Sequence, residues 1–392
     1  MGPSNPATGG GDRLRGASAS TVREAIERAD PLPGTSGFAG AVDGRLVRDV
    51  LGRVPLYVSA DYDRNVETGE SELAPSVDPA TPVTDLEWGF RPTAVTNPVA
   101  VPAGIVWGVE GQHRQWSLPD PEPLSDTERA IESLAGAIET ALGDVPVENA
   151  AVAFSGGVDS ALLASRLGLA LFVGGFPGST DIEAAREAAE SMGCLADLHV
   201  VEFDHDTLER AIPRVARAIG RTNAMDLSIA LSLSLVADRV SAEGFDRLIL
   251  GQGADELFGG YEKIQRLDHR VEASTVRGAV REVLGTLPAQ LPRDVLAVER
   301  AGVTPVMPYL HDAVVESALA LPGPLLADES GRKYGLRRVA ADYLPESVAT
   351  REKKAVQYGS LTARELDRLA RQAGYKRRMD DHVSQYVHSL LE

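Results

Sequence analysis

One six-residue segment constrains this chain more than any other, because it joins a glycine turn to the start of a helix. Residues 155–160 read Ser-Gly-Gly-Val-Asp-Ser. They follow an apolar run at 150–154 and precede a helix-forming stretch, which predicts a strand, a tight turn and a helix. The glycines let the backbone approach a ligand closely, and the helix N-terminus offers free N–H groups to an anion. The segment therefore predicts a phosphate site, with Asp159 placed to hold Mg²⁺.

This loop differs from two common phosphate-binding motifs. No G-x-x-x-x-G-K-S/T sequence occurs in the chain, and no G-x-G-x-x-G sequence follows a predicted strand. The segment instead resembles the pyrophosphate-binding loop of the ATP pyrophosphatase superfamily, whose members cleave ATP to AMP and pyrophosphate. An ordinary serine- and glycine-rich turn between a strand and a helix is the structural alternative.

Strands and helices alternate around the loop. Strands are predicted at 149–154, 169–175, 197–203 and 246–251, and helices at 159–167, 181–192, 206–219 and 226–242. This alternation predicts an α/β fold, a doubly wound parallel sheet with helices on both faces. From residue 261 onward the pattern is helical, with breaks expected at prolines such as Pro292 and Pro305.

Two capping boxes predict where helices begin. Ser125 is followed three residues later by Glu128, and Thr180 is followed by Glu183 in the same spacing. In such a box the hydroxyl accepts from a backbone N–H of the first turn, and the carboxylate reaches back to the cap. We therefore expect Ser125 and Thr180 to be N-cap residues.

The front of the chain has a different character. Short apolar runs between Gly, Pro and Asp in 36–116 predict a small β-rich domain. The expected division is a disordered tail at 1–30, the β-rich domain at 31–117, a proline-stiffened linker at 118–124, a nucleotide-binding domain at 125–370 and a C-terminal helix or tail at 371–392.

Composition narrows the class of protein. The 392 residues include 57 acidic and 39 basic ones, a net charge of −18, which argues against nucleic acid as an obligate partner. Only five of the basic residues are lysines; such an acidic, lysine-poor chain suits a halophilic cytosol, where salt screens charge.

The one cysteine, Cys194, excludes a disulfide framework within the sequence. No apolar run reaches 18 residues and no signal peptide is evident, so we expect no membrane association and a cytoplasmic protein.

A second glycine-rich cluster ends the strand predicted at 246–251. Residues 250–261 read Leu-Gly-Gln-Gly-Ala-Asp-Glu-Leu-Phe-Gly-Gly-Tyr. Because the carboxyl ends of parallel strands meet at one edge of the sheet, Asp255 is expected to face Asp159 across a triphosphate. Mg²⁺ is commonly held by one or two carboxylates together with substrate phosphates, so the pair predicts a metal site.

Together the two motifs resemble the synthetase domain of the asparagine synthetase family, which carries S-G-G-x-D-S and then S-G-E-G-x-D-E-x-F-G-G-Y. Further segments fit in order over about 125–360. They are 304–312, similar to R-x-P-F-L-D without its Arg; 333–337, similar to K-x-x-L-R; and 344–359, similar to L-P … R-x-K … G. The resemblance implies a nucleotide-binding domain similar to the adenine nucleotide alpha-hydrolases and a ligase that uses ATP and Mg²⁺.

The resemblance also implies roles for individual residues. Lys353 would contact the phosphates and act in catalysis with Asp159 and Gln252, and the metal would lie on Asp159 and Asp255. The nucleotide would contact a wider set: Phe154, Ser155, Gly156, Gly157, Asp159, Ser160, Val173, Gly251, Gly253 and Lys353. A fixed cation beside developing negative charge is the electrostatic device expected at such a site. Lys354, its neighbour, is the alternative candidate.

One departure from the family pattern concerns the amine. Gln252 stands where the family has Glu, and an amide cannot take up a proton at neutral pH, although it can accept a hydrogen bond from an amine. Beta-lactam synthetases resemble this family and also replace that residue. On the sequence alone, restoring glutamate by Gln252→Glu is expected to raise the use of ammonia.

The front domain resembles a shortened glutaminase domain. Residues 48–57 are similar to that domain's R-D-x-x-G-x-x-P-L-Y stretch. The glutaminase needs a nucleophilic Cys at position 2, where this chain has Gly2, so we expect no glutamine hydrolysis here.

These observations predict a carbon–nitrogen ligase that adenylates a carboxylate, by default aspartate, and passes it to ammonia to give asparagine. Three alternatives remain open. They are an amide ligase on another carboxylate or amine, a tRNA-modifying enzyme of the same superfamily, and an ATP-binding relative without activity. A separate glutaminase and a homodimer are partners that the sequence leaves open.

Overall fold

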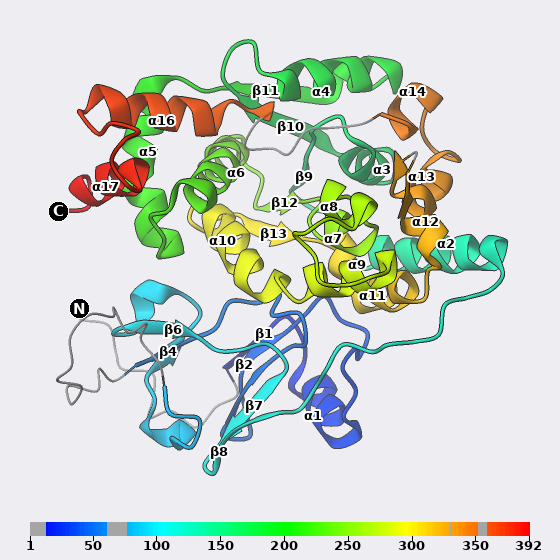
Figure 1. Cartoon of the computed structure of the whole chain (residues 1–392), viewed down its shortest axis with the longest axis vertical. Coiled ribbons are helices and arrows are strands. Elements are labelled where there is room, and N and C mark those ends of the chain that lie inside the picture. Colours follow the sequence, from blue (N-terminus) through cyan, green and yellow to red (C-terminus); the bar gives the residue numbers. More distant parts are fainter. Residues whose placement is uncertain (1–12, 61–76, 330, 352–358) are drawn as a thin grey trace. The chain divides into compact units, whose positions relative to one another are not determined.

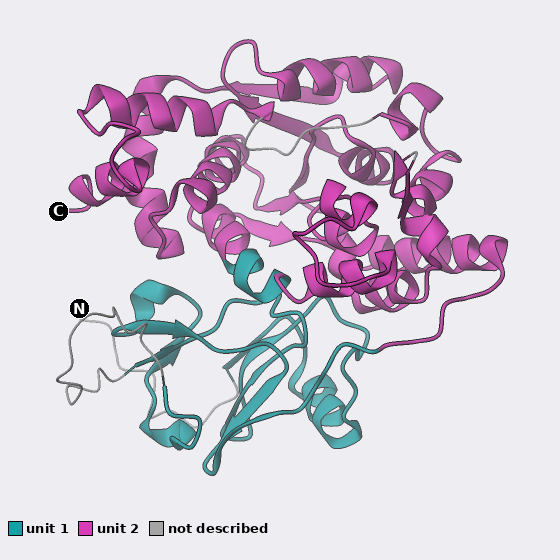
Figure 2. Cartoon of the chain, viewed as in Figure 1, with its two compact units in different colours: residues 1–119, 287–292 teal, residues 120–286, 293–392 magenta. Residues whose placement is uncertain are grey.

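The computed structural model describes residues 13–60, 77–329, 331–351 and 359–392, and the chain divides into two compact units (Figures 1 and 2). Unit 1 comprises residues 1–119 and 287–292, and unit 2 comprises residues 120–286 and 293–392. The finer boundaries proposed at residues 30, 124 and 370 stay predictions.

Unit 1 is built from antiparallel strands, which confirms the predicted β-rich character. One sheet has the order β1 (Arg13–Arg15), β2 (Ala39–Val42), β3 (Arg45–Arg48), β7 (Ile105–Gly108) and β8 (Gly111–Arg114). A smaller sheet pairs β4 (Tyr57–Ser59) with β5 (Trp88–Gly89) and β6 (Pro98–Ala100). Alternating residues of these strands, such as Leu46, Val58 and Trp107, form its buried core.

The predicted disordered tail at 1–30 differs from the structure over its second half. Strand β1 pairs with β2, and helix α1 (Ala19–Arg28) follows it. The Ser18 side chain accepts a hydrogen bond from the Thr21 amide, and Val22 and Ala25 are buried. A satisfied N-cap and an apolar face stabilise this helix in spite of the glycine-rich sequence before it.

The R-D-x-x-G stretch of unit 1 forms a closed, buried turn. The Asp49 carboxylate accepts from the backbone of Leu51 and Arg53 at 3.0 Å and from Arg53 Nε at 2.8 Å. The Arg48 guanidinium is also buried and donates to the carbonyl oxygens of Gly52 and Val54. Both charges of the motif thus hold the turn together.

Unit 2 contains a parallel sheet, as predicted. Within the described residues its order is β11 (Leu198–Glu202), β10 (Ala170–Gly175), β9 (Ala150–Ala153), β12 (Arg247–Ile249) and β13 (Thr304–Val306) (Figure 1). The edge strand β13 lies in a segment that sequence reasoning expected to be helical. Its short length and Pro305 hide the strand signal, and an edge position tolerates a proline.

Helices connect the strands in two directions from β9. Helix α3 (Val158–Leu167) leads to β10 and α4 (Thr180–Ser191) leads to β11, whereas α5 (His205–Ile219) and α6 (Ala224–Ala242) return the chain to β12 on the other side of β9. Because parallel crossovers are right-handed, reversing direction places α6 on the opposite face from α3 and α4. The doubly wound prediction is confirmed.

The two predicted capping boxes are each displaced by one residue. Helix α2 (Thr127–Gly143) is capped by Asp126, whose carboxylate accepts from the amides of Glu128 and Arg129. Helix α4 is capped by Ser179 rather than Thr180. In both places two neighbouring residues can cap, and the backbone entering the helix decides which one does.

The remaining elements complete unit 2. They are α7 (Ala254–Leu257), α8 (Glu262–Arg266), α9 (Val276–Leu284), α10 (Leu287–Glu299, shared with unit 1), α11 (Asp312–Leu319), α12 (Gly323–Leu326), the hairpin of β14 (Ala327–Asp328) and β15 (Gly331–Arg332), α13 (Tyr334–Ala340), α14 (Glu346–Ala349), α16 (Thr362–Gln372) and α17 (His382–Ser389). Short 3₁₀ turns are η4 (Leu195–Asp197) and η5 (Pro308–Leu310) in unit 2, and η2 (Val83–Asp85) and η3 (Pro92–Ala94) in unit 1.

Helix α10 runs through Pro292, where a break was predicted. Proline has a helical φ, so the helix loses one hydrogen bond there, and the buried side chains of Leu291, Val295 and Leu296 offset that loss. Among the described helices, none has both the length and the apolar composition needed to cross a bilayer.

Candidate active site

A cavity of about 310 Å³ lies in unit 2, at the place where the sheet reverses its direction of growth. Its walls come from the carboxyl ends of β9, β10 and β12 and from α3, α6 and the 260–262 segment. Open α/β sheets bind their ligands at such a switch point. One part of the wall is apolar: Phe154, Phe172, Val173, Ile229, Leu233, Val236 and Leu250.

The loop after β9 has the predicted strand–turn–helix form. The buried Ser160 hydroxyl accepts from the Ser155 amide at 3.1 Å and donates to the Gly157 carbonyl at 3.3 Å, which ties the two ends of the loop together. Gly156 has φ +71°, and a Cβ there would lie 2.3 Å from the Ala184 carbonyl oxygen. The turn therefore requires glycine at position 156.

The N-terminus of α3 opens into the cavity without a side-chain cap. Its N-cap residue, Gly157, has no side chain, and Val158, Asp159 and Ser160 of the first turn line the cavity. Three of the helices that connect the strands of this sheet are, in contrast, capped by side chains: α4 by Ser179, α5 by Asp204 and α6 by Asn223. The open N–H groups and the positive end of the helix dipole make this position favourable for an anion.

Asp159 and Asp255 meet at the cavity, as predicted, and a lysine lies between them. Lys333 Nζ is 2.8 Å from both carboxylate oxygens of Asp159 and 2.6 Å from Oδ1 of Asp255. The Lys333 side chain is only 8% exposed. Burial would lower the pKa of Lys333, but the two carboxylates outweigh burial and raise it above its ordinary value. Lys333 is therefore a permanently charged link between the two sequence motifs.

The backbone around this ion-pair cluster is adapted to it. Lys333 itself has φ +60°, in the left-handed region, at the start of α13. A Cβ at Gly260 would lie 2.0 Å from Asp255 Oδ1 and 2.4 Å from Lys333 Cε. The second glycine of the D-E-x-F-G-G segment, Gly260, therefore provides the space in which the lysine and the aspartate meet.

The two carboxylates suit a divalent cation. Both have oxygens within 2.8 Å of one ammonium nitrogen, so a single cation can already contact both groups in this geometry. Carboxylate oxygens completed by substrate phosphates are a usual magnesium set. No larger group of His, Cys, Asp and Glu that could hold a metal occurs in the described part of the chain. A Mg²⁺ ion bound by both carboxylates would take the position that the Lys333 ammonium occupies in this structure.

Gln252 also lines the cavity, and its side-chain amide is hydrogen-bonded to a buried carboxylate. Its Nε2 donates to Asp294 Oδ2 at 2.5 Å. Asp294 is 2% exposed and accepts from Arg293 Nε at 2.7 Å and Nη2 at 3.1 Å. Arg293 in turn donates to Asp226 Oδ1 at 2.9 Å. Gln252 therefore stands at the end of a buried charged network.

A buried acid lies beside Asp255. Glu256 accepts a hydrogen bond from the Tyr261 hydroxyl, and burial together with the Asp255 carboxylate raises the pKa of Glu256 to about 7. Burial, followed by the Glu256 and Asp255 charges, raises the pKa of Tyr261, so its phenol keeps its proton. The pair stabilises the segment that carries Asp255.

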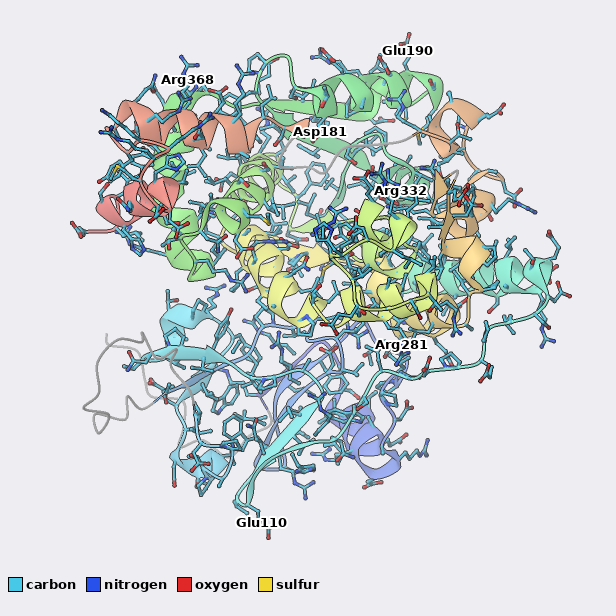
Figure 3. The ribbon with its side chains drawn as sticks, viewed as in Figure 1. Glu110, Asp181, Glu190, Arg281, Arg332 and Arg368 are labelled. Carbon is cyan, nitrogen blue, oxygen red and sulfur yellow. The ribbon has the colours of Figure 1, made fainter. Side chains whose placement is uncertain are left out.

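Three arginines contribute to the cavity wall. Arg332 donates to the Gly260 carbonyl, and Arg337 donates to the carbonyl oxygens of Ala349 and Arg351. Arg351 also lines the cavity, and its guanidinium donates to the Ala184 carbonyl at 3.0 Å. Arg332 and Asp181, both of the lining, are marked in Figure 3. The three guanidinium groups line the same cavity as the open N-terminus of α3.

The structure brings most of the predicted site residues to one cavity. Its lining includes Phe154, Ser155, Gly157, Asp159, Ser160, Val173, Gly251, Gln252 and Asp255. Gly156 and Gly253 are not in the lining; a Cβ at Gly253 would lie 2.4 Å from Leu310 Cδ2, so this glycine permits close packing. Lys353 and Lys354 lie outside the described residues, as does Gly2. Cys194, the one cysteine, is partly buried and is the N-cap of η4.

Sequence reasoning missed Lys333, Asp294 and Asp181 as candidate site residues. A signal for Lys333 was present, because it opens the K-x-x-L-R segment and is one of only five lysines. Arg337 belongs to the same K-x-x-L-R segment, and Arg351 belongs to the L-P … R-x-K … G segment at 344–359. Nothing in the sequence around Asp294 marks it, because its role depends on α10 reaching the end of β12.

The chain matches a known protein family. The asparagine synthase family model matches residues 131–297 and 268–389, which is more than half of the chain. The asparagine synthetase B, glutamine-hydrolysing, of Escherichia coli is 26% identical over 367 residues, covering 85% of this chain and 62% of that protein. A Methanocaldococcus jannaschii protein that carries the asparagine synthetase name is 27% identical over 275 residues, covering 60% and 50% respectively.

A plant asparagine synthetase is similar to this chain to the same degree. The glutamine-hydrolysing asparagine synthetase of Brassica oleracea is 26% identical over 299 residues, covering 66% of this chain and 49% of that protein. The chain thus spans about half to three-fifths of the length of these relatives. From the family match and the geometry of the cavity, we conclude that the chain belongs to the asparagine synthase domain family, whose membership implies the use of ATP.

Proposed function

We propose that this chain is an ATP-dependent carbon–nitrogen ligase that adenylates a carboxylate and transfers the acyl group to ammonia, with aspartate as substrate and asparagine as product. One observation carries the proposal: an uncapped helix N-terminus, two carboxylates and a buried lysine converge on one cavity at the switch point of the sheet. This combination suits a polyphosphate with its counter-cation.

The first step would use the phosphate side of the cavity. A substrate carboxylate oxygen attacks the α-phosphorus of ATP, the bond to the β-phosphate oxygen breaks, and pyrophosphate leaves. The N–H groups of the 155–160 loop would hold the phosphates, and Lys333 would hold Asp159 and Asp255 in place until the nucleotide arrives. Mg²⁺, when bound to those two carboxylates, would neutralise charge on the departing pyrophosphate.

The second step would use the Gln252 side. The amine nitrogen attacks the activated acyl carbon, the bond from that carbon to the phosphate oxygen breaks and AMP leaves, and the proton that the amine loses passes to the departing phosphate or to solvent, which leaves a neutral amide. Gln252 lines the same cavity as the phosphate loop, so one substrate can contact both. Lys353, from its place in the R-x-K segment, is proposed to stabilise negative charge in both steps.

The source of ammonia is part of the proposal. The one cysteine of the sequence, Cys194, lies in unit 2 and not in the unit whose 48–57 segment resembles the glutaminase domain, so we propose free ammonia, or ammonia from a separate glutaminase, as the amine. A homodimer and a cytoplasmic location stay proposals from the sequence.

One observation favours a second candidate. Gln252 replaces the glutamate of the family motif and is bonded to a buried carboxylate. An amide ligase that joins a different carboxylate or amine, as in beta-lactam synthetases, would accommodate that change. Both candidates share the adenylation step.

A pyrophosphate-release screen separates these functions. The purified chain, in concentrated KCl with MgCl₂ and ATP, would be given a panel of carboxylates with ammonium chloride or glutamine. Release that requires aspartate and ammonia supports asparagine formation, and release that requires another pair supports the second candidate. The Asp159→Asn variant is the matched control, because it removes one carboxylate of the cluster at nearly constant volume. Absence of AMP with every acid tested, together with no ATP binding, would overturn the proposal.

A further inference from the structure

The buried network behind Gln252 fixes which way its amide points. An ionised carboxylate oxygen only accepts hydrogen bonds, so the group that faces Asp294 Oδ2 must be the Nε2 amide nitrogen of Gln252. The reverse orientation would set two acceptor oxygens against each other. The carbonyl oxygen Oε1 is therefore the hydrogen-bond acceptor that Gln252 can offer to a ligand of the cavity.

The orientation is held rigidly because Asp294 is itself clamped. Arg293 engages both of its oxygens, and the two residues are 6% and 2% exposed. Arg293 extends to Asp226, which also accepts from Arg221 at 3.0 Å and from Asn223 at 2.8 Å. Two carboxylates and two guanidinium groups thus alternate with no net charge. Burial acts to lower the pKa of Arg293, but Asp294 and Asp226 outweigh it and raise that pKa.

The same contact explains why glutamate does not suit position 252. A glutamate there would bring a second carboxylate oxygen to hydrogen-bond distance of Asp294, whose own side chain is almost closed to water. Like charges at that separation in a buried place strongly disfavour the ionised form of one of them. The expectation from sequence, that Gln252→Glu raises ammonia use, therefore reverses.

We propose that Asp294 is a positioning residue that orients Gln252 so that Oε1 accepts a hydrogen bond from the N–H of the incoming amine. The inference rests on the proposed amide-forming function. An amide carbonyl holds an amine but takes no proton from it, so this side of the cavity selects an acyl acceptor that arrives as an unprotonated amine: ammonia, or a weakly basic amine such as hydroxylamine. Asp294 contributes specificity for the amine and nothing to adenylation.

The test separates the two half-reactions. Exchange of labelled pyrophosphate into ATP, measured without amine, reports the adenylation step. The KM for ammonium chloride and for hydroxylamine in the full reaction reports the amine step, with the carboxylate that gives the fastest exchange. In Asp294→Asn the asparagine amide can both donate to and accept from the Gln252 amide, so Gln252 adopts both orientations. The KM for both amines should then rise about tenfold, equivalent to about 1.4 kcal/mol. The ratio of the amine effect to the exchange effect is the readout, because a purely structural role would change both together.

A charge-exchange pair provides the second measurement. Gln252→Glu alone should lose most amine use, and the double variant Gln252→Glu with Asp294→Asn should recover part of it, because an asparagine Nδ2 can donate to the new carboxylate. Asp342→Asn, at an exposed position, is the matched control and should behave as wild type. If Asp294→Asn does not fold, the Gln252→Glu and Gln252→Met variants, which leave the Asp294–Arg293 clamp intact, carry the test.

The outcomes are distinct. An unchanged amine KM in Asp294→Asn, or amine use in Gln252→Glu equal to or above wild type, overturns the role of Asp294 while leaving adenylation in place. Absence of exchange with every carboxylate in the wild-type chain overturns the proposed function itself.

Discussion

Replacing Lys333 by methionine should cost this protein a measurable part of its stability. The substitution keeps the length of the side chain and removes the ammonium that contacts Asp159 and Asp255. Leaving one side of a buried ion pair unpartnered costs about 3–5 kcal/mol. We expect the lower end, about 3 kcal/mol, because the Asp159 and Asp255 side chains are 24% and 50% exposed and regain some hydration. For a domain of this size that loss corresponds to roughly 6 °C in Tm.

A divalent cation should reverse the loss. With the ammonium gone, two carboxylates face one position, and a cation at about 100 times its Kd returns about 2.7 kcal/mol, close to the whole deficit. The assay is thermal unfolding of wild type and Lys333→Met in EDTA and across a MgCl₂ or MnCl₂ titration, without nucleotide. Lys376→Met, at an exposed lysine, is the control and should match wild type in both conditions.

Two results would refute this reasoning. If Tm is unchanged in EDTA, the ion pairs of Lys333 do not stabilise the fold as their geometry indicates. If magnesium stabilises wild type and Lys333→Met equally, the ammonium and the metal do not share one position between the carboxylates.

Three other predictions concern single positions. Gly156→Ala places a Cβ 2.3 Å from the Ala184 carbonyl oxygen at φ +71°, so it should destabilise the chain by about 1–3 kcal/mol and weaken protection by ATP in thermal unfolding; an unchanged Tm would contradict the tight turn. Burial raises the pKa of Asp226, but a neighbouring amide and two guanidinium groups outweigh burial and lower that pKa. Urea unfolding should therefore show Asp226→Asn about 1–3 kcal/mol less stable than wild type at pH 7, and this difference should disappear as the pH falls below about 3.9. A difference in stability that does not depend on pH would contradict this. Asp159→Asn and, from the sequence pattern, Lys353→Ala should each abolish pyrophosphate release, and turnover that survives either change excludes that residue from the reaction.

Local patterns predicted the parts of the fold that depend on residues close together in sequence. The strand–turn–helix at 150–167 was predictable because glycine placement, apolar runs and helical spacing act within a few residues of one another. The alternation that follows fixed the parallel sheet, since parallel neighbours require crossovers. The same local information was ambiguous at the helix starts, where Asp126 and Ser179 cap in place of Ser125 and Thr180.

Other features needed the folded chain. Strand β13 is three residues long and contains Pro305, so its assignment depends on pairing with β12 rather than on its own sequence. Helix α10 continues through Pro292 because the packing of its apolar residues outweighs the lost hydrogen bond. In both places tertiary contacts override a local signal.

The sequence by itself determined that this chain carries a glycine-rich strand–turn–helix loop on a doubly wound sheet, with Asp159 and Asp255 at the same edge. Only the tertiary structure decided that Lys333 lies between these two carboxylates and that Asp294 accepts a hydrogen bond from Gln252. Lys333 lies 174 residues from Asp159, and Asp294 lies 42 residues from Gln252. Each of these contacts is a charge or hydrogen bond between residues on different elements, and its strength depends on distance, burial and direction in space. Those quantities exist only once the sheet, α10 and α13 have packed together, so no local pattern in the sequence encodes them.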